Sequence, residues 1–280
     1  MFESIHFKGL AQSALFGYAK DVSFFKDRKE LAFKPGLNIL FGPNGCGKST
    51  VLNILAQSLA AAQGGVSTVT QDHVSSTVDM YAALRQRDGS KGAMKDKIGL
   101  LVRHDGQPVV YSDPRKAVGV TGGSFDDDFM ERGIAEAMGS ARRSHGQLSL
   151  SRSDTALAVL LGKVAHPQTI VSKLNKKTVN DQWVKALELV EKRLDASVER
   201  GQPSVLLDEP EANFSLVWQS RLWSLLSRAD VAQKHQVIVA SHSPFALGIP
   251  HANYIEFETG YLEEALAALK SHFAKIPPIS

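Results

Sequence analysis

This sequence of 280 residues contains a single cysteine, little excess of one charge over the other and no long apolar run. The single cysteine, Cys46, excludes an internal disulfide framework and a cysteine-rich zinc site. No apolar run approaches the ~18 residues that a membrane-spanning helix requires. A secretory signal would begin with basic residues and an apolar core, and neither is found in the opening residues MFESIHFKGLAQ. We therefore expect a cytoplasmic protein with no membrane insertion.

The net charge is only +3, which is too small by itself to indicate a nucleic-acid-binding domain. Charge is nevertheless concentrated in residues 142–193, which hold ten Lys or Arg and four acidic residues. This basic stretch could follow a phosphate backbone, form a solvated helical subdomain or meet an acidic protein. It has little aromatic content beyond Trp183, so we do not expect stacking on single-stranded nucleic acid.

The pattern of apolar residues predicts alternating strands and helices. Short apolar stretches predict strands at 5–8, 30–34, 37–41, 205–207, 236–240 and 254–257. Helix-forming or amphipathic stretches predict helices at 49–62, 181–199, 214–228 and 261–274. Residues 98–111 look like a hairpin, because Asp105-Gly106 suits a tight two-residue turn. The alternation predicts an α/β fold around a largely parallel sheet.

Residues 42–50 read GPNGCGKST and fit the phosphate-loop pattern G-x-x-x-x-G-K-[ST], between a predicted strand and a predicted helix. Glycines let successive backbone N–H groups point at a phosphate, and the helix presents its positive end to the same anion. Lys48 would reach the β- and γ-phosphates, and the Ser49 hydroxyl would bind Mg²⁺. The predicted nucleotide site comprises Gly42, Pro43, Asn44, Gly45, Cys46, Gly47, Lys48, Ser49 and Thr50.

Cys46 lies within this loop and has two interpretations. A thiol beside Lys48 and a helix N-terminus could have a lowered pKa and be redox-sensitive. It could instead be a small residue tolerated at a variable loop position. We favour the second interpretation, because no nearby residue supplies a second thiol.

Two further polar segments follow apolar strands. In SVLLDEPEANF, residues 204–214, Asp208 would hold Mg²⁺ through water and Glu209 would orient or deprotonate the attacking water. In VIVASHSPF, residues 237–245, His242 could reach a γ-phosphate in the same crevice. The predicted catalytic residues are therefore Lys48, Glu209 and His242.

The segments GPNGCGKST, DEPE and ASHSP together resemble the ABC-type ATPase heads of the SMC/RecF/OLD class. The resemblance is closest to the soluble AAA-like ABC ATPases of DNA repair and anti-phage defence. It covers residues 1–65 and 200–260. It implies a P-loop NTPase fold with an ABC-type head, in which a largely parallel sheet is joined by an antiparallel N-terminal β part and a helical subdomain.

The resemblance also implies roles and partners. ATP and Mg²⁺ would be the cofactors, with Asp208 on the metal, Glu209 as the catalytic base and His242 as the switch histidine. Two copies would enclose ATP head-to-tail in a dimer or higher oligomer. The signature loop that reaches the other copy's ATP would be Ser144-His145-Gly146-Gln147, in which His145 departs from S-G-G-Q and Ser144, Gly146 and Gln147 would contact nucleotide.

Other family positions are open. The glutamine that reaches the metal could be Gln71, or alternatively Gln107, and the aromatic ring that stacks on adenine could be Tyr18, Phe24 or Phe25. We expect one ATPase domain over residues 1–280, with a helical insert over about 73–195 that carries the signature loop.

Other functions compete with this one. The chain could be the ATP-binding subunit of a membrane ABC transporter, although the missing S-G-G-Q and the DEPEANF continuation argue against it. A P-loop kinase would leave the ASHSP segment unexplained. A scaffold or sensor locked by ATP would show tight binding with little turnover. Since no nuclease segment and no sustained heptad run is recognisable, we expect a separate effector protein to act.

Overall fold

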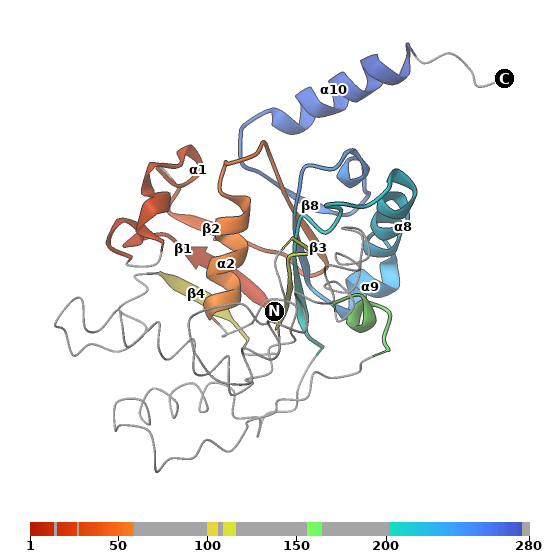
Figure 1. The fold of residues 1–280 in the computed structure, drawn as a ribbon. Coiled ribbons are helices and arrows are strands. Elements are labelled where there is room, and N and C mark those ends of the chain that lie inside the picture. The colour runs from red at the N-terminus through yellow and green to blue at the C-terminus, as the bar shows by residue number, and fades with distance from the viewer. Residues whose placement is uncertain are drawn as a thin grey trace, which may run out of the picture.

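The computed structural model describes residues 1–13, 16–26, 28–58, 100–105, 109–115, 156–163 and 202–275. Its centre is a five-stranded parallel sheet in the order β5-β6-β7-β3-β8 (Figure 1). The strands in that order are Val109–Ser112, Ser204–Asp208, Val237–Ser241, Leu37–Phe41 and Asn253–Glu256. Strands β3, β6 and β7 are buried along their whole length, which is why they read as continuous apolar runs. The predicted parallel core is confirmed.

A second sheet is antiparallel and has the order β2-β1-β4. Its strands are Glu30–Ala32, Phe2–His6 and Leu101–His104. The chain between β1 and β2 forms two short 3-10 helices and one helical turn, η1 (Leu10–Gln12), η2 (Gly17–Asp21) and α1 (Ser23–Lys26). The expected antiparallel β part is present, so the α/β fold class of a P-loop NTPase is confirmed.

The hairpin predicted over residues 98–111 is wrong. Its two strands enter different sheets, because β4 pairs antiparallel with β1 whereas β5 pairs parallel with β6. The two strands differ in burial, although each is the outermost described strand of its sheet. Every residue of β5 is buried, as suits a strand of the helix-covered parallel sheet, whereas β4 is exposed or half-exposed along its length. Both strands fall within residues 73–195, the segment expected as a helical insert, so this segment also contributes strands to the two sheets.

Helices cover both faces of the parallel sheet (Figure 1). Helix α2 (Lys48–Ser58) packs on one face together with the antiparallel sheet. On the other face lie α8 (Leu216–Leu226), α9 (Ala229–Lys234) and the helical residues 156–160. A 3-10 turn, η3 (Pro244–Ala246), leads towards β8, and α10 (Tyr261–Phe273) extends from the body with no fully buried residue.

Among the described residues, none of the helices combines the length and the apolar character needed to cross a bilayer. The helix predicted at 181–199 lies outside the described residues.

Gln236 joins the two sheets. It is only 2% exposed and lies immediately before β7. Its side-chain oxygen accepts the Phe2 N–H at 2.6 Å, and its amide nitrogen donates to the Phe2 carbonyl at 2.8 Å and to the Lys34 carbonyl at 3.1 Å. One amide side chain at the amino end of the central strand β7 therefore satisfies backbone groups of β1 and of the connection between β2 and β3.

We expect Gln236→Leu to lower the free energy of unfolding by roughly 2–3 kcal/mol, because it leaves these buried backbone groups unpaired. Urea unfolding followed by circular dichroism measures the change. Gln233→Leu, at an exposed position of α9, is the matched control and should leave stability nearly unchanged. Equal effects of the two substitutions would contradict the role assigned to Gln236.

Candidate active site

The carboxyl ends of three neighbouring strands form the floor of the site. In the parallel registers, Leu40 is opposite Ala240 and Ala240 is opposite Asp208. The ends of β3, β7 and β6 are therefore level, and adjacent strands lie only about 4.8 Å apart. The residues that follow each strand meet at this edge: the phosphate loop after β3, His242 after β7 and Glu209 after β6.

The phosphate loop turns sharply into α2 and packs closely against α1. Gly47 has a φ of +104°, and a Cβ atom there would lie 2.7 Å from the Phe25 ring. Only glycine fits both requirements. Lys48 is 4% exposed, and its ammonium donates to the Gly42 and Pro43 carbonyls at 2.7 Å each. The loop thus holds its own lysine at the place where phosphate oxygens would replace the two carbonyls.

Cys46 is a buried thiol, with Sγ 3.8 Å from the Lys48 ammonium. Burial raises the pKa of Cys46 and outweighs the lowering by Lys48. A thiol that keeps its proton is a poor nucleophile and a poor redox sensor. The geometry therefore agrees with a small residue tolerated in the loop.

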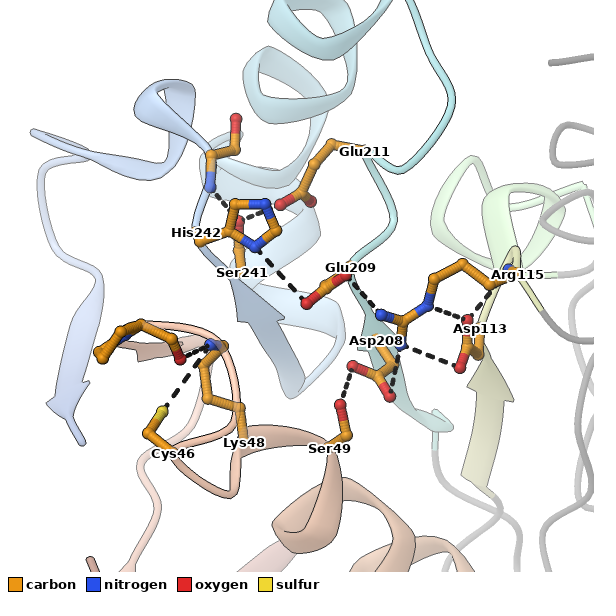
Figure 2. A network of polar contacts seen from close by, with 12 residues as sticks. Cys46, Lys48, Ser49, Asp113, Arg115, Asp208, Glu209, Glu211, Ser241 and His242 are labelled. Carbon is orange, nitrogen blue, oxygen red and sulfur yellow. Dashed lines mark hydrogen bonds and ion pairs between the residues drawn. The ribbon is translucent and has the colours of Figure 1, made fainter. Parts of the chain in front are cut away.

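Ser49 and Asp208 meet across the site. The Ser49 hydroxyl donates to Asp208 Oδ1 at 2.8 Å, and the Asp208 side chain is fully buried (Figure 2). A hydroxyl and a carboxylate are hard oxygen donors of the kind that Mg²⁺ prefers, and a Mg²⁺ ion usually takes its remaining ligands from water and substrate phosphates. The pair fits a nucleotide-bound Mg²⁺.

Glu209 has an uncommon backbone conformation, with a φ of 45°. A non-glycine residue in this region is strained by on the order of 1–3 kcal/mol, and such strain gathers at functional sites. Its carboxylate is 15% exposed and lies 3.5 Å from Nδ1 of His242, which is itself half-exposed. The structure thus brings both predicted residues together at the open side of the edge, as Figure 2 shows.

Arg115 is part of the site, and the sequence reasoning missed it. It follows β5, and its guanidinium donates to Glu209 Oε2 at 2.5 Å and lies 3.2 Å from Asp208 Oδ2. It also binds the buried Asp113 side chain through two nitrogens, at 2.9 and 3.1 Å. These carboxylates raise the pKa of Arg115 despite its partial burial. The overlooked signal is Asp113-Pro114-Arg115 directly after an apolar strand, the same placement as the other two polar segments.

Glu211 is a second residue that the sequence reasoning missed. It is 5% exposed, and its Oε1 accepts the Ser241 hydroxyl at 2.5 Å. Ser241 in turn accepts the Ser243 N–H at 2.9 Å. The hydrogen bond between Ser241 and Glu211 connects the turn after Asp208 to the end of β7, and so fixes Glu209 and His242 relative to one another. Burial is the main cause that raises the pKa of Glu211.

The three aromatic residues considered for base stacking differ in accessibility. Phe24 and Phe25 are buried at 6% and 4% exposure, and the Phe24 ring stacks on Phe257. Tyr18 is 65% exposed, and its hydroxyl lies 3.3 Å from the Thr50 hydroxyl in the phosphate loop. Of the three, only Tyr18 has an exposed side chain beside the phosphate loop.

Several predicted residues lie outside the described part of the chain. These are the metal candidate Gln71, its alternative Gln107, and the signature-loop candidates Ser144, Gly146 and Gln147. Of the basic stretch 142–193, only residues 156–163 are described.

The raised pKa of Glu211 predicts a pH dependence of stability. Above its ordinary pKa of 4.5, the Glu211 carboxyl of the unfolded chain loses a proton that the folded chain retains, so the free energy of unfolding falls as pH rises until Glu211 ionises in the folded protein as well. Glu211→Gln removes this titration and keeps an acceptor for Ser241. Relative to the variant, the wild type should lose unfolding free energy from about pH 4.5 upward, as measured by urea unfolding at several pH values. Parallel curves for the two proteins would contradict the assignment.

One protein-family model, described as AAA domain, matches residues 20–108. The matched segment includes the phosphate loop, α2 and β4, and it ends before Asp208, Glu209 and His242. No curated protein is similar enough to the chain to match it. Residues 20–108 are thus similar to an AAA domain, which indicates a nucleotide-binding ATPase of the P-loop type.

Proposed function

We propose that this chain binds ATP with Mg²⁺ at the carboxyl edge of its parallel sheet and hydrolyses the ATP. The observation that carries the proposal is the 2.8 Å contact between Ser49 and Asp208. It joins the phosphate loop to the end of β6, 159 residues away in the chain, and so supplies hydroxyl and carboxylate ligands at one point. The similarity of residues 20–108 to an AAA domain supports the same activity.

Each residue has a role that follows from its position. Lys48 would exchange the Gly42 and Pro43 carbonyls for the β- and γ-phosphates, which are stronger acceptors because they are charged. Ser49 and Asp208 would hold Mg²⁺, which neutralises charge on the phosphate oxygens when it is bound. Tyr18 would stack on the base, since its ring is exposed while its hydroxyl contacts Thr50.

Glu209 would accept the proton of the attacking water. Its carboxylate lies at the open side of the site between Arg115 and His242. His242 lies beside Glu209 at the same edge of the sheet, and its imidazole would orient the attacking water or the γ-phosphate. This assignment would give the strained backbone of Glu209, with its φ of 45°, a function at the site.

Two copies would pair head-to-tail around ATP and act on a separate effector, in DNA repair or anti-phage defence. The resemblance of the three motifs to ABC-type heads supports the pairing. The exposure of Tyr18 and His242 also supports it, because both leave the nucleotide site accessible to a second surface. Residues 142–193 would supply a face for nucleic acid, on the basis of their charge.

We expect Lys48→Ala to abolish measurable ATP binding and to reduce phosphate release by at least ~100-fold, because it removes the buried ammonium that would bind the β- and γ-phosphates. Fluorescent-nucleotide binding and a phosphate-release assay measure the two effects. Lys234→Ala, at an exposed position of α9, is the control. Wild-type turnover in Lys48→Ala would refute the ATPase assignment, and tight ATP binding without turnover in the wild type would favour the ATP-locked scaffold.

We expect Glu209→Gln to bind ATP and to lower turnover by ~10²–10⁴-fold, since the amide cannot accept the proton. With hydrolysis blocked, Mg²⁺-ATP should convert the protein to a dimer, as measured by light scattering after size-exclusion chromatography. Glu263→Gln, exposed on α10, should behave as the wild type. A Glu209→Gln protein that remains monomeric with saturating Mg²⁺-ATP would count against head-to-tail pairing.

A further inference from the structure

Arg115 places a positive charge among three carboxylates at the edge of the sheet (Figure 2). Asp113 holds it most firmly. The Asp113 carboxylate accepts the Arg115 backbone N–H at 3.0 Å and two guanidinium nitrogens, and its side chain is fully buried. Asp113 is therefore the anchor that fixes the guanidinium in front of β6.

The remaining guanidinium contacts reach residues that the ATPase reaction needs. One nitrogen lies 3.2 Å from Asp208 Oδ2, and another donates to Glu209 at 2.5 Å. Because Ser49 donates to the other oxygen of Asp208, both oxygens of this carboxylate lie beside groups of the chain itself. Two carboxylates without any exposed surface, Asp113 and Asp208, depend on nearby positive charge for their stability as anions.

A divalent cation held by Asp208 would stand beside this guanidinium. Like charges a few ångströms apart repel strongly at a partly buried site. Arg115 and Mg²⁺ are therefore competitors for the same carboxylate. The Arg115 side chain is 38% exposed, so its guanidinium has space to move away from Asp208. The hydrogen bond from the Arg115 backbone N–H to Asp113 would hold the backbone in place during that movement.

We propose that Arg115 is a positioning residue of the ATPase site, which neutralises Asp208 and Glu209 as an internal cation and is displaced from Asp208 when Mg²⁺ binds together with ATP. The proposal rests on the proposed function. In consequence, free Mg²⁺ binds poorly on its own, and metal binding is made to depend on the phosphates that accompany it. Arg115 also holds the Glu209 carboxylate in an ion pair until Mg²⁺ replaces the guanidinium at Asp208.

The test is a Mg²⁺ titration without nucleotide, at constant ionic strength set with NaCl so that general screening does not change. Melting temperature and isothermal titration calorimetry are recorded for the wild type, Arg115→Gln and Arg115→Lys. We expect Arg115→Gln to melt several degrees lower than the wild type, because two buried carboxylates lose their counter-charge. Added Mg²⁺ should restore most of that loss and should bind at least about tenfold more tightly than to the wild type.

Two control variants and one substitute variant make the result specific to Arg115. Arg228→Gln removes an exposed arginine that pairs with Asp230 at 2.8 Å, and it should leave the Mg²⁺ response unchanged. Adding Asp208→Asn to Arg115→Gln should abolish the Mg²⁺ response. If Arg115→Gln does not fold, Arg115→Lys takes its place: it retains a charge but loses the two-nitrogen grip on Asp113, and its Mg²⁺ affinity should rise at least twofold.

A destabilised Arg115→Gln protein that Mg²⁺ does not recover would overturn the proposal and leave Arg115 a purely structural residue. So would an Arg115→Lys protein with wild-type Mg²⁺ affinity, or equal responses of the wild type and Arg115→Gln. Since the titration contains no ATP, it can fail while ATP hydrolysis stands, and it can succeed in a chain that binds ATP without hydrolysing it.

Discussion

The alignment of three parallel strands is the constraint on which the site depends. Strands β3, β7 and β6 pair in a register that brings their carboxyl ends level. Segments separated by more than 150 residues, which carry the phosphate loop and the Asp208-Glu209 pair, therefore emerge side by side, and the Ser49–Asp208 hydrogen bond connects them. The interposed strand β7 adds His242 between them. A shift of one residue in either pairing would turn alternate side chains to the opposite face and separate these groups.

Charge is the second constraint, because this edge gathers more carboxylates than a buried surface tolerates alone. Asp113, Asp208 and Glu211 are almost completely buried, and they are stabilised in different ways. The first two share the Arg115 guanidinium, whereas Glu211 has a raised pKa and a serine hydroxyl as its hydrogen-bond donor. Two carboxylates that share a guanidinium and a carboxyl group whose pKa is raised by burial thus lie at the ends of the neighbouring strands β5 and β6.

The sequence predicts the site where a motif and an apolar strand occur together. Lys48, Ser49, Asp208, Glu209 and His242 all follow such strands, and they do meet in the fold. The sequence does not predict which strand pairs with which. The Asp105-Gly106 turn favoured a hairpin on local grounds, but tertiary pairing placed β4 and β5 in separate sheets. The same error hid Arg115, whose relation to Asp208 is apparent only once β5 lies beside β6 in parallel.

Lys48 and Arg115, two cations of the described part of the site, are held by the chain's own acceptors. Lys48 is bound by two loop carbonyls, and Arg115 is bound by three carboxylates. ATP carries the anions that would release Lys48, and its Mg²⁺ carries the charge that would release Asp208 from Arg115. ATP alone would leave Asp208 paired with Arg115, and Mg²⁺ alone would leave Lys48 bound to the loop carbonyls. An exchange of this kind would be cooperative by charge balance: nucleotide and metal would be favoured as a pair, and the Glu209 carboxylate would be released from Arg115 only when both are bound.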